Sequence, residues 1–380
     1  MSEVGKQRVV VLFGGQSAEH DVSCTSAVAV LRALDPSRYE VLPIGVTTSG
    51  QWVRSASALE LLARVASGTT DAGALPRRVE VAGPAISSAE ALPVLAGVDG
   101  AVDLPVVFPV IHGPFGEDGT VQGMLELAGV PYVGSGVLSS AVSMDKGVAR
   151  ELVRAAGLPL ASWHTRAAWE IDSPASRASF AELVASTLGW PAFVKPANLG
   201  SSVGVSKAHD AEEFAAAVDL ALVYDDHVVV EETILGREIE FAVLGNERPE
   251  VSVAGEIRPG NEFYDYEDKY LDDNARLLIP APLSADEQAE GQRIALATYR
   301  ALRCEGMARI DLFYDDGSTG GPGRGWFVNE ANTIPGFTPI SQYPKLWEAS
   351  GLPYPQLVDR LIALAIARHA RRSGRVGRTR

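Results

Sequence analysis

The sequence is poor in cysteine, contains no long apolar run and carries no excess of positive charge. Its two cysteines are too few for a disulfide framework or a cysteine-rich zinc site, which fits a reducing compartment such as the cytoplasm. It has no run of about 18 apolar residues, so no membrane-spanning helix is expected. The net charge of −15 argues against nucleic acid or an anionic membrane as a partner, because both bind basic surfaces.

The first residues of the sequence do not predict a targeting segment, and the last ones predict a frayed tail. The N-terminal residues lack the charged and apolar stretches of a secretory signal. The other end, from Arg371 to Arg380, is short, basic and poor in apolar residues. We therefore expect this tail to be frayed.

The first third of the sequence predicts a parallel α/β region. A strand pattern at 8–13 is broken by two glycines, a helical pattern continues to Leu34, and a second strand pattern covers 39–46. A strand, a helix and a strand in this order form a βαβ unit, which places both strands parallel in one sheet. Residues 54–101 show little periodicity, and we expect an edge region there with one short helix.

The rest of the sequence alternates between helix and strand patterns without an internal repeat. Glycines at 134 and 136 mark a first boundary, so we expect domains at 1–135, 136–234 and 235–372 and a disordered tail at 373–380. The expected helices cover 121–128, 145–156, 180–188, 212–222, 285–302 and 354–371. The expected strands cover 104–111, 131–133, 191–196, 204–207, 228–232, 307–314 and 326–329, and a strand-rich run covers 237–257.

A lysine at the end of an apolar strand is the first candidate for chemistry. Lys195 ends the strand pattern at 191–196, and a Gly-Ser-Ser sequence that contains Ser201 and Ser202 follows closely. Exposed N–H groups, hydroxyls and an ammonium together form a cradle for phosphate, although the spacing is not that of a Walker A loop. A plain β-hairpin with an edge lysine explains the same pattern equally well.

Two neighbouring strand patterns near the C-terminus carry acidic and amide side chains. Arg309 and Asp311 alternate along one strand, and Glu330 and Asn332 alternate along the next, so each pair points to one face. Two carboxylates and an amide oxygen suit Mg²⁺ bound together with phosphate. A surface ion-pair ladder is the alternative, which the apolar residues between these positions disfavour.

Two loops near these strands are further candidates for ligand contact. Gly336 follows Pro335 and allows close approach of the backbone, so its N–H together with Arg309 would stabilise an oxyanion. A proline-fixed turn is the alternative. The polar loop at 263–270 is dense in aromatic residues and predicts a lid rather than a solvated charge run.

Two polar residues of the N-terminal region lie at expected strand ends. His112 follows a parallel strand, where open α/β sheets bind their ligands, although a lone histidine there is more often structural. Glu19 lies at the first strand–helix turn. It either complements the helix dipole or binds a substrate ammonium.

Taken in order, seven segments resemble the D-alanine–D-alanine ligases of the ATP-grasp superfamily. The resemblance extends from about residue 8 to 365 and departs mostly at 54–101 and 317–325. No single segment is decisive, but their joint order and spacing are highly specific. The segments are GGQSAEHDVS, FPVIHGPFGEDGTVQG, GVLSSAVSMDK, FVKPANLGSSVGVSK, EFYDYEDKY, MARIDLF and NEANTIPGFTPIS.

The resemblance implies an α/β (α+β) chain with a three-domain ATP-grasp fold that holds ATP between two sheets. The implied reaction joins two D-alanines through an acyl phosphate, for peptidoglycan precursor synthesis. The implied ligands of two Mg²⁺ or Mn²⁺ ions are Asp311, Glu330 and Asn332. The implied ATP-binding residues are Lys146, Lys195, Ser202, Glu231, Glu232, Ile234 and Glu238, with Glu231 at the adenine and Glu238 at the ribose.

The resemblance also assigns a first amino-acid subsite. There Glu19 would anchor the ammonium of the first D-alanine, and His112 would line the subsite. Ser201 and Tyr270 match the hydrogen-bonding partners that hold the lid closed. Tyr270 also indicates an amine rather than D-lactate as the second substrate.

A second subsite follows from the same resemblance. Lys269 and Ser341 match the residues that hold the carboxylate of the second D-alanine, and Arg309 with the Gly336 N–H matches the oxyanion site. Gln342 stands where many relatives have an apolar residue, so D-serine, D-lactate or an antibiotic-pathway acceptor stays an alternative. The resemblance implies a homodimer with small-molecule substrates.

Overall fold

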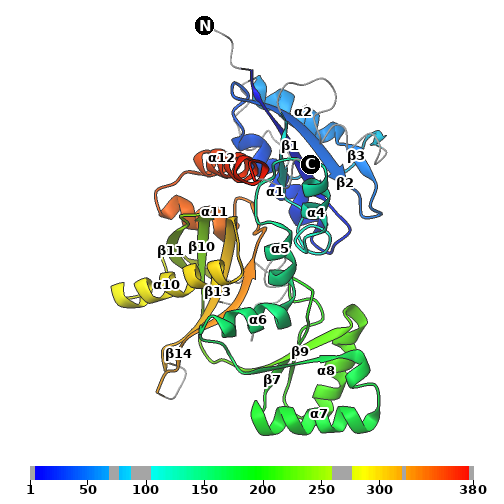
Figure 1. The fold of residues 1–380 in the computed structure, drawn as a ribbon, viewed down its shortest axis with the longest axis vertical. Helices are drawn as coiled ribbons and strands as arrows, with labels where there is room; N and C mark the ends of the chain where they lie inside the picture. The colour runs from blue at the N-terminus through cyan, green and yellow to red at the C-terminus, as the bar shows by residue number, and fades with distance from the viewer. Residues whose placement is uncertain (1–4, 68–76, 87–103, 259–275, 319–321, 376–380) are drawn as a thin grey trace.

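The described residues form three β-sheets arranged one below another along the longest axis of the molecule (Figure 1). The structure is a computed structural model, and it describes residues 5–67, 77–86, 104–258, 276–318 and 322–375. The N-terminal sheet lies at one end, the sheet that contains β7 and β9 lies at the other, and the sheet with β10 and β13 lies between them.

The N-terminal sheet contains the expected parallel strands. Strand β1 (Gln7–Gly14) pairs parallel with β2 (Tyr39–Val46) on one side and with β5 (Val106–Pro109) on the other. Two short antiparallel strands, β3 (Trp52–Arg54) and β4 (Ala85–Ile86), extend the sheet beyond β2. The helices of this region are α1 (His20–Ala33), α2 (Ala56–Ala66) and α4 (Thr120–Leu127).

The second sheet is antiparallel and has the strand order β6-β9-β7-β8. Its strands are β6 (Trp163–Ala167), β7 (Ala192–Pro196), β8 (Ser206–Ala208) and β9 (His227–Glu232). Helices α7 (Pro174–Thr187) and α8 (Ala211–Tyr224) pack on it through Phe180 and Phe214. Helices α5 (Val137–Met144) and α6 (Lys146–Ala155) connect this sheet to the N-terminal region.

The third sheet has the order β12-β11-β10-β13-β14 and all of its pairings are antiparallel. Its strands are β10 (Arg237–Gly245), β11 (Glu250–Arg258), β12 (Arg276–Leu278), β13 (Gly306–Asp315) and β14 (Gly325–Asn332). Phe241 packs toward α10 (Ala285–Ala301), whereas Leu244 packs toward α11 (Gln342–Ala349). The alternation follows from the two-residue period of a strand, and it gives the sheet two different faces.

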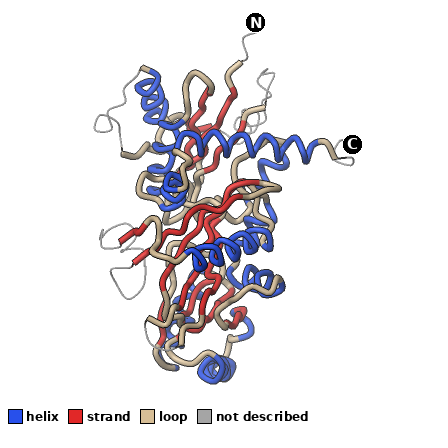
Figure 2. Tube along the Cα trace, turned by 90° about the vertical axis from the view of Figure 1, so that its left-hand side faces the viewer, coloured by secondary structure: helices blue, strands red, loops and turns tan. Residues whose placement is uncertain are grey.

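The last helix, α12 (Tyr354–Ser373), packs the C-terminal end of the chain against the N-terminal region. It contacts α1 and β5 as well as β10 and β13. In both views it lies between the N-terminal sheet and the third sheet (Figures 1 and 2). Arg368 is buried on this helix and donates hydrogen bonds to the carbonyl oxygens of Tyr132 and Gly134. Core residues of α12 and of β1 therefore belong to one hydrophobic cluster.

Several details differ from the sequence expectations. Strands β3, β4, β6 and β12 and helices α5 and α11 were not predicted, because short elements with serine or polar residues give weak periodic signals. The expectation of a tail frayed from Arg371 is wrong for its first residues: Arg372 pairs with Glu126 and Glu305, and α12 continues to Ser373. The expected lid at 263–270, residues 376–380 of the tail, 319–321 and parts of 54–101 lie outside the described residues.

Candidate active site

Polar side chains gather on the face of the third sheet that α11 covers in part. Asp311 on β13 lies opposite Glu330 on β14, and Arg309 lies opposite Asn332. A β-bulge follows directly, because the register shifts between Asp311 and Leu312. The four residues therefore share one face, as their alternation predicted, and the bulge ends that regular pairing at the acidic pair.

Arg309 holds the centre of this polar face. Its Nε and Nη2 donate to the two carboxylate oxygens of Asp311 at 2.7 Å each. Its Nε also lies 3.2 Å from Oε2 of Glu240. Burial by itself lowers the pKa of Arg309, but Asp311 and Glu240 raise it well above its ordinary value. The guanidinium is thus a permanent positive charge on the same face of β13 as Asp311, as the alternation predicted.

Glu240 is a site residue that the sequence reasoning missed. It is buried on β10, between Gly255 on β11 and Asp311 on β13. The signal was available, because Glu238 and Glu240 alternate in an otherwise apolar strand in the same way as Arg309 and Asp311. A second carboxylate beside Arg309 leaves the acidic face with negative charge for a cation to neutralise.

The oxygen atoms of this face fit a hard divalent cation. Asn332 Oδ1 is buried and has no hydrogen-bond partner, which is costly unless another group binds it. The carboxylates of Asp311 and Glu330 lie across the strand pair from each other. Within the described residues no group of three or more His, Cys, Asp and Glu side chains is placed to hold a metal. The set here has two carboxylates completed by an amide, and Mg²⁺ accepts such sparse protein coordination when phosphate and water supply the other oxygens.

Lys195 lies one residue before the end of β7, beside a buried acidic residue of β9. Its Nζ donates to Oε2 of Glu231 at 2.9 Å, and Nη2 of Arg150 lies 2.6 Å from Oε1 of the same carboxylate. Burial raises the pKa of Glu231, but the charges of Arg150 and Lys195 lower it by a larger amount, so that it falls to about 2. Arg150, on α6, was not predicted from the sequence. It leaves this cluster with two cations for one carboxylate.

Lys146 connects the second and third sheets electrostatically. It is the first residue of α6, and its Nζ donates to the carbonyl oxygen of Leu199. Burial lowers the pKa of its ammonium, the charge of Glu330 raises it, and the charge of Lys195 lowers it again. The charges of Glu330 and Lys195 therefore both act on the Lys146 ammonium.

The segment 233–236 links the last strand of the second sheet to the first strand of the third. Ile234 lies in this link, Glu232 precedes it and Glu238 follows it on β10. Glu232 accepts hydrogen bonds from both terminal nitrogens of Arg324 and from the backbone N–H of Ser162. These bonds tie β9 to the start of β14, so the link has a fixed path between the sheets.

Glu19 and Ser201 meet although they come from different regions of the chain. Ser201 Oγ donates to Oε1 of Glu19 at 2.5 Å. Ser201 and Ser202 have φ values of 51° and 57°, which are unusual for residues other than glycine. A Cβ at Gly113 would lie 3.1 Å from Oε2 of Glu19. Glycine there leaves room around the carboxylate.

His112 and Glu117 form a buried pair next to this carboxylate. His112 Nδ1 lies 3.7 Å from Oε1 of Glu117 and both residues are buried. Burial favours the neutral ring of His112, but Glu117 raises its pKa above the ordinary value. Burial raises the pKa of Glu117 to about 7. The two nitrogens of the ring also contact Ile334 and Ser26, so the histidine is engaged within the protein.

The loop at 333–341 follows β14 and contains Gly336 and Ser341. Gly336 is part-exposed between buried neighbours, and a Cβ there would lie 2.7 Å from Ser341 Oγ. Ser341 Oγ accepts from the backbone N–H of Thr338 at 3.0 Å. Gln342 begins α11; it is buried and neither atom of its amide group has a hydrogen-bond partner. Lys269 and Tyr270 lie outside the described residues.

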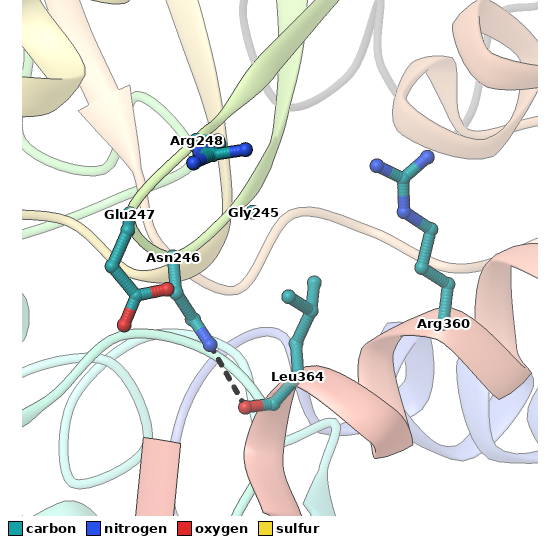
Figure 3. A pocket seen from close by; sticks show the side chains of 6 residues that line it. All are labelled: Gly245, Asn246, Glu247, Arg248, Arg360 and Leu364. Atoms are coloured by element: carbon teal, nitrogen blue, oxygen red, sulfur yellow. Dashed lines mark hydrogen bonds between the residues drawn. The ribbon is translucent and has the colours of Figure 1, made fainter. Parts of the chain in front are cut away.

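A separate cavity of about 390 Å³ lies at the β10–β11 turn and contains none of the predicted site residues (Figure 3). Asn246 Nδ2 donates to the carbonyl oxygen of Leu364 at its base, and Arg360 points into it from α12. Arg360 is already paired with Glu250. The convergence of the acidic face, two lysines and Glu19 therefore defines the candidate active site better than this cavity does.

Two family models match nearly the whole chain. The model described as D-ala D-ala ligase N-terminus matches residues 8–135, and the model described as D-ala D-ala ligase C-terminus matches residues 152–363. The chain is 45% identical over 370 residues to the D-alanine–D-alanine ligase of Bacillus cytotoxicus, covering 96% of this chain and 97% of that protein. It is 47% identical over 374 residues to that of Shouchella clausii, covering 97% of each.

Two solved structures share the fold with a TM-score of 0.77. One is the VanG D-Ala:D-Ser ligase from Enterococcus faecalis, with 35% identity, 95% of this chain and 100% of that chain covered. The other is the D-alanine–D-alanine ligase from Coxiella burnetii, with 37% identity, 97% of this chain and 96% of that chain covered. The expected ATP-grasp fold is confirmed, and the chain belongs to the D-alanine–D-alanine ligase family.

Proposed function

We propose that this member of the family joins two D-alanines to D-alanyl-D-alanine, with ATP as the source of energy. One observation supports this reaction most strongly: Asp311, Glu330 and Asn332 lie on one face of the third sheet, and Asn332 Oδ1 is buried there without a hydrogen-bond partner. Phosphoryl transfer needs cations around the transferred group and acidic ligands for a metal in one place. Membership of the family implies ATP use.

ATP would lie between the second and third sheets. Lys146 and Lys195, with the Ser202 backbone, would contact its phosphates, and the link 233–236 with Glu231, Glu232, Ile234 and Glu238 would surround its adenosine. Glu231 is paired with Lys195 and Arg150, so it also fixes the ammonium of Lys195 that would contact the phosphates.

Asp311, Glu330 and Asn332 would hold two Mg²⁺ or Mn²⁺ ions with the phosphate oxygens. When bound, these ions would neutralise phosphate charge during transfer. The unpaired Oδ1 of Asn332 supports this assignment, because a cation would satisfy it. Arg309 donates two hydrogen bonds to the Asp311 carboxylate. These bonds fix the orientation of the carboxylate oxygens that would bind the metal.

The first D-alanine would bind with its ammonium at Glu19, next to His112. Its carboxylate would then face the γ-phosphate and become an acyl phosphate, which converts a poor electrophile into a reactive one. Ser201 contacts Glu19 directly, and we propose that Tyr270 joins this contact from the lid. A closed lid keeps water from the acyl phosphate until the second amine attacks.

The second D-alanine would place its carboxylate at Lys269 and Ser341. When its amine attacks, negative charge develops on the former carbonyl oxygen, and Arg309 with the Gly336 N–H would stabilise that charge. The amine must lose a proton, and phosphate leaves with the electrons of the broken C–O bond. Peptide bond formation then completes the reaction.

A second acceptor is favoured by one observation. Gln342 follows Ser341, is buried and has both amide atoms unpaired, so it offers a donor and an acceptor to a polar acceptor side chain. The VanG ligase, to which the chain is similar, is described as a D-Ala:D-Ser ligase. D-Serine is therefore the alternative second substrate, and D-lactate or an antibiotic-pathway acceptor is less supported.

The cellular setting belongs to the same proposal. A D-alanyl-D-alanine product serves peptidoglycan precursor synthesis, and we propose that the enzyme makes it in the cytoplasm, where ATP is supplied. No described helix is long and apolar enough to cross a membrane. We further propose a homodimer and the domain boundaries 1–135, 136–234 and 235–372, which the family-model limits at 135 and 152 support near the first boundary.

The test is an ATP-dependent phosphate-release assay with D-alanine, D-serine, D-lactate and L-alanine, with identification of the product. We expect phosphate and D-alanyl-D-alanine in a 1:1 ratio with D-alanine alone, and little release with L-alanine. Phosphate without a dipeptide would reject the ligase reaction. A mixed dipeptide in preference to D-alanyl-D-alanine, with D-alanine and D-serine together, would select the alternative acceptor.

A further inference from the structure

Two residues of the N-terminal region hold both ends of the backbone around Gly336. His112 Nδ1 lies 3.0 Å from the carbonyl oxygen of Ile334. The backbone N–H of Phe337 donates to Ser26 Oγ at 3.2 Å. Ile334 and Phe337 flank Pro335 and Gly336, so the contacts fix the segment on either side of the glycine. Neither Ser26 nor this use of His112 follows from the family resemblance.

The contacts form one continuous hydrogen-bonded chain. A carbonyl oxygen only accepts, so the contact with Ile334 requires a proton on His112 Nδ1. Ser26 Oγ lies 3.1 Å from His112 Nε2. In the neutral ring Nε2 accepts the Ser26 hydroxyl proton, while the same oxygen accepts the Phe337 N–H. Each polar atom then has a partner, which matters because Ser26, His112 and the loop ends are all buried.

The remaining anchors of this segment come from other elements. Tyr354, the first residue of α12, donates to the carbonyl oxygen of Phe337 at 2.8 Å. Ser17 donates to the carbonyl oxygen of His112 at 2.7 Å and so fixes the histidine backbone. Gly336 stays part-exposed while Ile334, Pro335 and Phe337 are buried. We call the contacts of His112 with Ile334 and of Ser26 with Phe337 the clamp. The clamp leaves Gly336 as the part of the segment that a substrate can reach.

We propose that Ser26 and His112 are positioning residues that orient the Gly336 N–H for the step in which the amine attacks the acyl phosphate. This inference rests on the proposed function. A hydrogen-bond donor stabilises an oxyanion only when it is held at the right place before charge develops. The N-terminal region, which also carries Glu19, would in this way set the oxyanion donor in register with the first substrate.

Ser26→Ala tests the clamp, and Ser23→Ala is its matched control. Ser23 lies one turn earlier on α1 and is equally buried, but it bonds Gly14 and Val110 rather than the loop. We expect Ser26→Ala to lower kcat by roughly tenfold to a hundredfold with little change in KM for ATP. Ser23→Ala should change kcat far less, and Ser26→Thr, which keeps the hydroxyl, should restore part of the loss.

Two further measurements separate positioning from general destabilisation. First, amide hydrogen exchange of the intact protein without ligands should rise at 334–338 in Ser26→Ala and stay unchanged there in Ser23→Ala. Second, D-alanine-dependent exchange of ¹⁸O between the bridge and non-bridge positions of ATP reports acyl phosphate formation. It should fall less than kcat in Ser26→Ala, because the oxyanion donor acts only afterwards.

The outcomes distinguish the inference from the proposed function. Equal hydrogen exchange at 334–338 in both variants would overturn the clamp. Increased hydrogen exchange with kcat equal to that of Ser23→Ala, or with isotope exchange reduced as much as kcat, would overturn the positioning role. A wild-type protein without ligase activity would reject the proposed function and this role with it, while the exchange measurement would still decide the clamp. If Ser26→Ala does not fold, Ser26→Cys, which nearly keeps the size of the side chain, is tested by the same measurements.

Discussion

Ser201 Oγ donates a hydrogen bond to the carboxylate of Glu19 at 2.5 Å, across 182 positions of sequence. Glu19 lies at the start of α1, and Ser201 lies in the loop between β7 and β8. The contact joins the region proposed for the first amino acid to the loop proposed for the phosphates. The orientation of the Glu19 carboxylate, which would bind the substrate ammonium, thus depends on Ser201 in the loop between β7 and β8.

The first prediction concerns this carboxylate. Glu19→Gln keeps the size of the side chain but removes the charge that would bind an ammonium. We expect KM for the first D-alanine to rise by about tenfold to a hundredfold, because a hydrogen bond to a charged group contributes about 1.5–3 kcal/mol. KM for ATP should change little. Steady-state phosphate release measures both, and the exposed Glu40 supplies the control Glu40→Gln; equal changes in the two KM values would remove the subsite assignment.

The second prediction concerns the metal ligands. Glu330→Ala should lower kcat at least about 100-fold with an unchanged fold, since metal ions supply several kcal/mol of charge stabilisation. Asn332→Ala should instead raise the Mg²⁺ concentration for half-maximal activity by about tenfold. Mg²⁺ titration of activity, with circular dichroism for the fold, tests both. Glu290→Ala on the exposed surface of α10 is the control, and a Glu330→Ala enzyme with normal kcat would refute the site.

The third prediction concerns pH and Glu231. Its folded pKa of about 2 lies below the ordinary value of 4.5, so the folded state binds its proton less readily than the unfolded state. The ionised carboxylate therefore contributes stability that is complete above about pH 5 and is lost as pH falls toward 2, about 3 kcal/mol in all.

Chemical unfolding of wild type and Glu231→Gln across this pH range measures the effect. The difference in the free energy of unfolding should be largest at neutral pH, where the variant leaves Arg150 and Lys195 without their partner, and should shrink toward pH 2. A difference that is independent of pH would contradict the lowered pKa. Glu151→Gln, at an exposed ion pair on α6, should show no comparable trend.

The fourth prediction concerns Gln342. Its amide is buried without partners, and a Cβ at Gly255 would lie 2.5 Å from its Oε1, so the glycine leaves the space that the amide fills. Gln342→Leu should raise the free energy of unfolding by about 1 kcal/mol, because it removes an unsatisfied buried group of similar volume.

The same variant tests the acceptor. If the amide contacts a polar acceptor side chain, Gln342→Leu should lower the use of D-serine relative to D-alanine in a competition assay. An unaltered product ratio would exclude that role. Gln292→Leu is the contrast, because Gln292 donates to the carbonyl oxygen of Ser252 at 2.9 Å and its loss should destabilise the protein.

Local sequence patterns were enough to predict which side chains form the acidic face of the third sheet. The two-residue period of a strand puts Arg309 and Asp311 on one face, and the register then pairs them with Asn332 and Glu330. The parallel order of β1, β2 and β5 followed from the βαβ pattern in the same way. The short strands β3, β4, β6 and β12 were missed, because two to five residues do not display a period.

The sequence by itself determined which side chains share a strand face and, through the order of its motifs, the family. Only the tertiary structure decided that Arg150 joins Lys195 at Glu231 and that Glu240 lies beside Arg309. The same holds for the contact of Ser26 and His112 with the loop around Gly336. Alternation along a strand depends on neighbouring residues alone, whereas these contacts join segments whose distance is set by how the three sheets and α12 pack together.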